Sequence, residues 1–277
     1  MKLFNTTHPK KITTEQLKLD DSLQYEDIYH LIKTKIMKKI NIQFLAILFI
    51  ATIFTSCGID IFNGVEGNRN IVTTERTPQA DFSGIKVSTG IDLFISQGNT
   101  NTITVKADEN LHDLIITEVK EGVLKIYTDK NIWKSKARKV YVTIEKLSFL
   151  KATSGSDVKS ETIIKTNEIS ISATSGAAIE IDVEAESVAT STTSGSDIKI
   201  TGTTINHASN ATSGSSIDAY DLKSDNAIAK ATSGASINIY ASKKMEGKAT
   251  SGADIDFKGN PATINKDVSS GGSISMN

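Results

Sequence analysis

The chain has 277 residues, with 31 basic and 32 acidic side chains and a pI near 6.4. Balanced charge and an aromatic content of 6% exclude the basic stripe and stacking platforms that nucleic-acid binding requires. The single cysteine, Cys57, excludes an intramolecular disulfide and a cysteine-based metal cluster, and the four histidines have no metal-ligand spacing. We therefore expect no cofactor. Scarce proline and abundant Thr, Ser and Ile favour β-structure.

The N-terminal part contains an export signal. A basic segment at Met37–Lys39 precedes an apolar run from Phe44 to Phe54, and small residues lead to Cys57. This order is typical of a secretory signal peptide, which we place at 37–56, and the run is too short for a comfortable membrane span. Because residues 1–36 are mostly polar and precede it, we hypothesise that Met37 is the true start and that 1–36 is an upstream extension.

The position of Cys57 resembles a bacterial lipobox. The resemblance implies cleavage before Cys57, acylation of its thiol with a palmitate-type chain, and stable attachment of the protein to a membrane. The alternative is a buried free cysteine behind an uncleaved anchor. Residues 57–79, rich in Gly and Asn at their start, are expected to be a tether between the lipid and the folded part.

Alternating apolar residues from Phe82 to Ile95 begin the β-structure. Turn-forming residues separate the next predicted strands, at 102–105, 124–127 and 140–144. The segment 111–116 fits either a helical turn or a strand.

A short phrase, Ala-Thr-Ser-Gly or a close variant, then recurs seven times. Its glycines are Gly155, Gly176, Gly195, Gly214, Gly234, Gly252 and Gly271. A repeat of about 20 residues predicts a solenoid in which each coil buries its apolar side against its neighbours. We expect a single-stranded parallel β-helix, right-handed, within a domain spanning 80–277.

Strand alternation assigns each position of the repeat to a face, counted from the glycine as zero. Positions +3 and +5 are mostly Ile and are expected inside, together with the small residues at −3, −1 and +1. Position −2 is expected to face outward as a threonine ladder: Thr153, Thr174, Thr193, Thr212, Thr232 and Thr250. At +4, Lys159, Glu180 and Lys199 alternate in sign on the solvated face.

Several segments together resemble the GIN-domain family, described as a putative auto-transporter adhesin head domain. They are Phe82-Ser83-Gly84-Ile85, Gly90-Ile91-Asp92-Leu93, Gln97-Gly98, Ala107-Asp108-Glu109-Asn110-Leu111, Gly122 with Leu124 and Ile126, and the repeated Ser-Gly-(Ala/Ser)-(Asp/Ser)-Ile. The resemblance covers about residues 80–277. It implies a β-helical fold, export, the envelope of a Gram-negative bacterium and no known enzyme activity.

Two other kinds of site are disfavoured by the pattern. Outward Asp157, Asp197 and Asp254 are separated by at least two coils, roughly 10 Å, which is too far for shared calcium ligation. No Gly-x-Ser-x-Gly motif and no cluster of acids is present, so we expect no enzyme.

We interpret the chain as an exported, lipid-anchored protein of the outer membrane, periplasmic or surface-exposed, and as a non-enzymatic, adhesin-like binding module. Its threonine face is expected to contact glycans or envelope proteins. The alternative is a structural spacer or a carbohydrate-binding accessory lipoprotein, with the threonines serving only as strand residues. The open last coil also suggests end-to-end self-association.

Overall fold

The computed structural model describes residues 64–277. The predicted signal peptide and Cys57 therefore lie outside the described residues. The described part contains β-strands and one 3-10 turn, Glu109–Leu111, and it holds no α-helix. No helix within residues 64–277 is long and apolar enough to cross a membrane.

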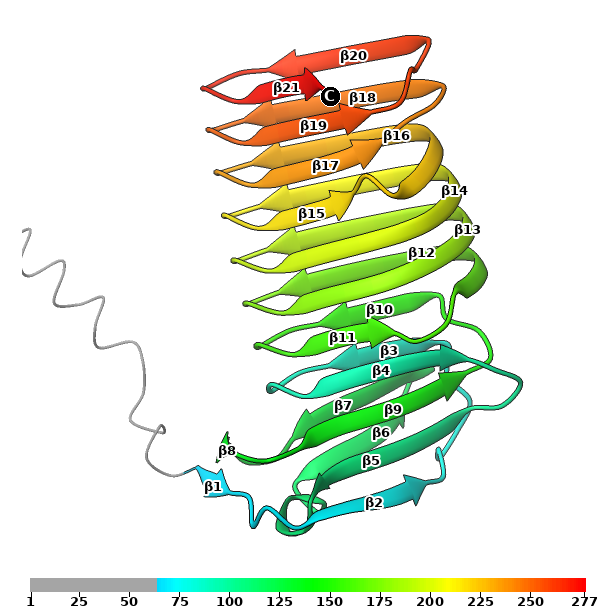
Figure 1. Cartoon of the computed structure of the whole chain (residues 1–277), viewed down its shortest axis with the longest axis vertical. Helices are drawn as coiled ribbons and strands as arrows, with labels where there is room; N and C mark the ends of the chain where they lie inside the picture. Colours follow the sequence, from blue (N-terminus) through cyan, green and yellow to red (C-terminus); the bar gives the residue numbers. More distant parts are fainter. Residues whose placement is uncertain (1–63) are drawn as a thin grey trace, which may run out of the picture. The chain divides into compact units, whose positions relative to one another are not determined.

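The strands fall into two groups (Figure 1). The N-terminal group is β1 (Val65–Glu66), β2 (Ile71–Arg76), β3 (Gly84–Val87), β4 (Asp92–Gln97), β5 (Thr102–Asp108), β6 (Ile115–Lys120), β7 (Val123–Thr128), β8 (Ile132–Lys134) and β9 (Arg138–Ile144). The repeat group is β10 (Phe149–Ala152), β11 (Asp157–Ser160), β12 (Ile164–Thr174), β13 (Ala178–Thr193), β14 (Asp197–Thr212), β15 (Ser216–Ala219), β16 (Leu222–Thr232), β17 (Ser236–Tyr240), β18 (Lys244–Thr250), β19 (Asp254–Lys258), β20 (Thr263–Val268) and β21 (Ser273–Met276).

The repeat group forms a solenoid of stacked coils, as predicted. In each coil a strand leads into a sharp turn and a second strand leaves it, and equivalent strands of successive coils pair in parallel. We call the two stacks the pre-turn sheet and the post-turn sheet. The long strands β13 and β14 bend from the post-turn sheet of one coil into its pre-turn sheet, so the two sheets are continuous around the core.

The Ser-Gly dipeptide makes the turn. Its serines have φ between 50° and 58° and its glycines φ between 63° and 75°, so two consecutive residues occupy the left-handed region. This is the pattern of a type I′ turn. A Cβ added at Gly214 would meet nothing within 4 Å, so glycine is required there for its backbone conformation and not for space.

The turns are themselves hydrogen-bonded from coil to coil. The N–H of each turn glycine donates to the carbonyl of the serine in the next coil, at 3.1–3.3 Å, from Gly90 through Gly252. Gly90 belongs to this ladder because Thr89 and Gly90 have the same positive φ values, 63° and 67°. The coil formed by β3 and β4 is therefore a member of the stack, although its turn reads Ser-Thr-Gly.

The core follows the predicted alternation except at one position. Position +3 is buried in coils one to six, and the small +1 residues Ser156, Ala177, Ser196, Ser215, Ala235 and Ala253 are buried as predicted. The predicted inward serine at −1 is wrong, since all seven of these serines are exposed. The two left-handed residues reverse the chain, so −2, −1 and zero all lie outside and strict alternation resumes only at +1.

An N-terminal cap covers the coil formed by β3 and β4. β9 pairs in parallel with β4 and antiparallel with β5, and β5 pairs antiparallel with β2. On the pre-turn sheet β7 pairs in parallel with β3 and antiparallel with β6. The strands predicted at 102–105, 124–127 and 140–144 are confirmed, but they form this cap instead of successive coils. The sequence left 111–116 open between a helical turn and a strand. In the structure Leu111 is the last residue of the 3-10 turn, and β6 begins at Ile115.

Two strands of the described fold, β1 and β2, lie inside the segment 57–79 that the composition assigns to a tether. The run Ile71-Val72-Thr73-Thr74 is β-branched throughout, which favours an added edge strand over a flexible linker.

The C-terminal end of the stack carries an inward lysine. Lys266 occupies a core position of β20, and its Nζ donates to the carbonyl of Ile274 at 3.0 Å and lies 5.0 Å from the Phe257 ring centroid. The core residues of this last coil, Val268 and Met276, are about half exposed. Lys266 is exposed, and its ammonium group borders the apolar side chains of the last described coil.

We predict that Ile217→Ala destabilises the protein by about 2–5 kcal/mol, because Ile217 is fully buried between two other aliphatic residues of the same column. Urea unfolding followed by circular dichroism measures this. Ser216→Ala, on the neighbouring outward position, is the matched control and should change stability by less than about 0.5 kcal/mol. Equal stability of I217A and wild type would refute the packing.

A second prediction concerns the turn. Gly214→Ala places a Cβ on a residue with φ 63° and should destabilise by about 1–2 kcal/mol, despite the free space around it. Ser213→Asn, at φ 58°, should be nearly neutral because asparagine tolerates this conformation. The same unfolding measurement applies, and the turn assignment fails if S213N is as destabilising as G214A.

Candidate functional site

The predicted threonine ladder is present on the surface. The ladder threonines pair directly with one another, as Thr174 with Thr193 and Thr212 with Thr232 and then Thr250. Each threonine is half-buried, and each Oγ1 lies 3.4–3.5 Å from the Oγ of the following serine. The turn edge therefore carries two parallel columns of hydroxyl groups, one of threonine and one of serine. The serine column escapes the sequence pattern because strand alternation places it inside.

A groove of about 460 Å³ lies on the outer face of the post-turn sheet. Asp157, Ala178 and Asp197 follow one another in register on three successive coils, and the short side chain of Ala178 leaves a gap between the two carboxylates. Further lining comes from Asp92, Phe94, Lys159, Glu180 and Lys199.

One side of the groove is an ion-paired column. Glu180 lies between Lys159 and Lys199, with O–N distances of 3.4 and 3.5 Å. The hydrogen bond from Lys159 and the charges of both lysines hold the pKa of Glu180 below its ordinary value. The alternating signs predicted at this position are therefore paired across coils.

The other side is a column of carboxylates. Asp92 of β4 lies in register with Asp157 of β11, and among the described residues neither has an ion pair within 4.0 Å. Burial, followed by the neighbouring Asp157 carboxylate, raises the pKa of Asp92, while Lys139 and Arg138 oppose the shift. Along the chain, the cap strands β5, β6, β7 and β9 lie between β4, which carries Asp92, and β11, which carries Asp157. The sequence pattern therefore missed this pair.

An aromatic pair borders the carboxylates. The rings of Phe94 on β4 and Tyr141 on β9 stack with centroids 4.9 Å apart and planes 17° from parallel. Lys139 lies with its Nζ 5.4 Å from the Phe94 centroid. The groove thus combines the Phe94 side chain, free acceptor oxygens and a charged column.

Metal binding receives no support from this arrangement. Within residues 64–277 no three His, Cys, Asp or Glu side chains are grouped so that they could hold a metal ion. Asp157 and Asp197 are two coils apart, as the repeat predicts, and Asp254 lies further along the stack.

A polar cluster interrupts the core between coils three and four. The His207 Nε2 lies 2.9 Å from the Thr190 Oγ1, which donates to the Ser209 Oγ at 3.1 Å. All three side chains are buried, so they form no accessible site. Burial lowers the pKa of His207 to about 4.

The sequence model of one family, described as "Putative auto-transporter adhesin, head GIN domain", matches residues 81–261. The chain belongs to this family. Membership in an adhesin family points to a bacterial envelope or surface protein. A comparison with curated proteins found no match.

Solved structures share the GIN-domain fold at low sequence identity. A putative adhesin from Bacteroides fragilis superposes with a TM-score of 0.73 and 19% identity, covering 77% of this chain and 100% of that one. A putative adhesin from Parabacteroides merdae gives 0.62 and 20%, covering 77% and 99%. A putative lipid binding protein from Parabacteroides distasonis gives 0.63 and 21%, with the same coverage. At these identities the similarity shows the fold.

We predict that the GIN domain loses stability as pH falls from 6.5 to 4. Unfolded His207 takes up a proton near pH 6.5 and the folded residue only near 4, so protons favour the unfolded state in this window by up to about 3 kcal/mol. Urea unfolding at pH 7 and pH 4 measures the effect. His207→Gln should lack this part of the loss, and the same pH dependence in both proteins would disprove the assignment.

Proposed function

We propose that this protein is an exported lipoprotein of a Gram-negative outer membrane, anchored through Cys57, and that it acts as a non-enzymatic binding module. Its membership in an adhesin-head family supports the envelope location. The apolar run before Cys57 supports export and acylation. The continuous buried core of the solenoid leaves the outer faces as the places where a ligand can bind.

The observation that carries the binding function is the groove on the post-turn sheet. The Phe94 side chain offers an apolar surface for the C–H groups of a sugar ring, and unpaired carboxylates accept hydrogen bonds from its hydroxyl groups. The solenoid holds Phe94, Asp92 and Asp157 on adjacent paired strands, which limits the ordering that binding requires. A carbohydrate is therefore the ligand class that the groove fits best.

Catalysis is disfavoured by the placement of the acids. A glycosidase places two carboxyl groups on opposite sides of the scissile bond. Asp92 and Asp157 are neighbours in one column, so a bound sugar lies over both and not between them. The raised pKa of Asp92 follows from burial and from this proximity.

The threonine ladder remains the second binding surface, and a spacer without a ligand remains the alternative. The ladder presents a regular row of neutral hydroxyl groups, which suits a repetitive polymer surface more than a single sugar.

A glycan array separates these possibilities. We expect Phe94→Ala and Asp157→Asn to weaken binding of a defined glycan at least about tenfold, because each removes a contact from the groove. Ser236→Ala, on the same face beyond the groove, is the control and should bind normally. Selective loss with T212Q/T232Q would assign binding to the ladder, and no glycan binding at all would support the spacer.

Anchoring has its own test. Cells fed an alkyne-tagged palmitate should label the wild-type chain and not Cys57→Ser, and the variant should leave the membrane fraction. An unlabelled wild-type chain would show that the lipobox resemblance misleads.

A further inference from the structure

The base of the domain carries an exposed aromatic side chain. Trp133, the only tryptophan of the sequence, is 59% exposed on β8. β8 pairs with β1, the first described strand, through Val65 and Ile132, and Gly64 lies against the Trp133 side chain. Trp133 therefore marks the point where the chain enters the domain.

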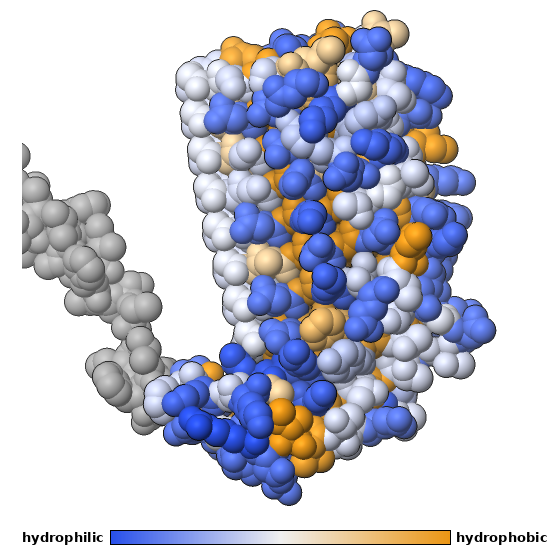
Figure 2. Space-filling model, viewed as in Figure 1, coloured by the Kyte–Doolittle hydropathy of each residue, from blue (hydrophilic) through white to orange (hydrophobic). Residues whose placement is uncertain are grey.

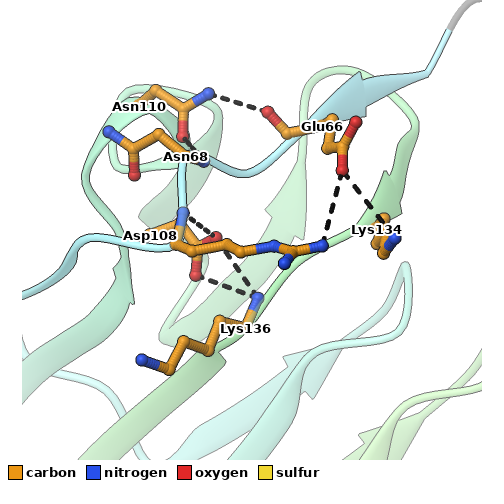
Figure 3. A network of polar contacts seen from close by, with 7 residues as sticks. Glu66, Asn68, Asp108, Asn110, Lys134 and Lys136 are labelled. Atoms are coloured by element: carbon orange, nitrogen blue, oxygen red, sulfur yellow. Dashed lines mark hydrogen bonds and ion pairs between the residues drawn. The ribbon is translucent and has the colours of Figure 1, made fainter.

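A basic depression lies beside this tryptophan. It has a volume of about 400 Å³ and is lined by Gly67, Arg69, Lys134, Ser135 and Lys136. Its exposed carboxylate is Glu66, whose Oε1 is 4.0 Å from Arg69 and 3.9 Å from Lys134. At these distances one carboxylate is shared between two cations (Figure 3). Figure 2 shows strongly hydrophilic side chains gathered at this lower corner, around β1 and β8.

Two further acids near the depression accept hydrogen bonds from the surrounding chain. Asp108 is fully buried, and its carboxylate accepts the backbone N–H groups of Arg69, Lys136 and Ala137 at 2.9–3.2 Å. Burial alone would raise the pKa of Asp108, but these donors outweigh it and the pKa lies below its ordinary value. Glu109 accepts the side-chain amides of Asn68 and Asn70. Asp108 thus fixes the backbone that carries the basic side chains (Figure 3).

We propose that this base docks on anionic phospholipid headgroups, with Arg69, Lys134 and Lys136 binding phosphates and Trp133 lying at the interface. The inference rests on the proposed anchoring at Cys57. Six residues lie between Cys57 and Gly64, so the seven Cα-to-Cα steps of the extended chain span at most about 25 Å and keep this base near the lipid. Tryptophan favours the membrane interface, and basic side chains are attracted to anionic lipid surfaces. In this orientation the coils stack away from the membrane, and β20 and β21 lie farthest from it.

Tryptophan fluorescence, excited selectively over tyrosine, tests the proposal because Trp133 is the only tryptophan of the sequence. The full chain is reconstituted in phosphatidylethanolamine vesicles containing phosphatidylglycerol, and separately in phosphatidylcholine vesicles, each with and without brominated lipid. In the phosphatidylglycerol vesicles we expect the Trp133 emission to shift to the blue and to be quenched by brominated lipid. In the phosphatidylcholine vesicles we expect little blue shift and little quenching. Lys134→Glu with Lys136→Glu should abolish the difference, whereas Lys230→Glu with Lys258→Glu on the repeat coils should keep it.

Two controls separate this inference from the anchoring itself. Mass spectrometry of the reconstituted chain reports acylation of Cys57, and a melting curve confirms that each variant is folded. If the chain is not acylated but still shows lipid-dependent quenching, the proposed anchoring is wrong and the docking surface is supported. A wild-type chain that is acylated and vesicle-bound, with water-exposed and unquenched Trp133 in both vesicle types, overturns the docking surface.

Discussion

The stacked Ser-Gly turn is the constraint on which the rest of the structure depends. Two left-handed residues in succession lead the chain from the pre-turn sheet into the post-turn sheet, and the glycine N–H of one coil bonds to the serine carbonyl of the next. This bond fixes the register of every coil, so the isoleucines at +3 fall above one another. The same register aligns the outward residues into columns. The threonine ladder, the carboxylates and the Lys-Glu-Lys series are all consequences of one repeated turn.

Different contacts are made at the two ends of the described stack. At the base, the antiparallel pairing of β2 with β5 and a buried carboxylate tie the entering chain to β5 and to the residues between β8 and β9. At the other end, Lys266 contacts Ile274 and Phe257. An inward-pointing charge on an edge strand disfavours the addition of a further strand, because the partner would have to bury it. End-to-end association of two molecules stays a prediction. An interface at this end of the stack would have to accommodate the charge of Lys266.

The sequence predicts the solenoid and most of its core because the repeat is strict. It misassigns Ser194 and its equivalents because alternation holds only for extended residues, and the left-handed turn is not visible in a pattern of residue types. It misses the contact of Asp92 with Asp157 for a different reason. Their coils are adjacent in space but separated by the cap, and the turn at Thr89–Gly90 lacks the repeated phrase. Phe94 and Tyr141 likewise meet only because β9 returns beneath β4. The groove joins β4 to strands of the repeat, so only the structure reveals it. The threonine ladder lies within the repeat, so the sequence alone predicts it.

Hydrogen exchange at the turn glycines tests the central claim most directly. Gly90, Gly155, Gly176, Gly195, Gly214, Gly234 and Gly252 each donate to a serine carbonyl, whereas Gly271 lies in the last coil of the described stack. The structure predicts slow exchange at the first seven amides and fast exchange at Gly271. Fast exchange throughout would show that the turns are not bonded from coil to coil, and the register that aligns every surface column would lose its physical basis.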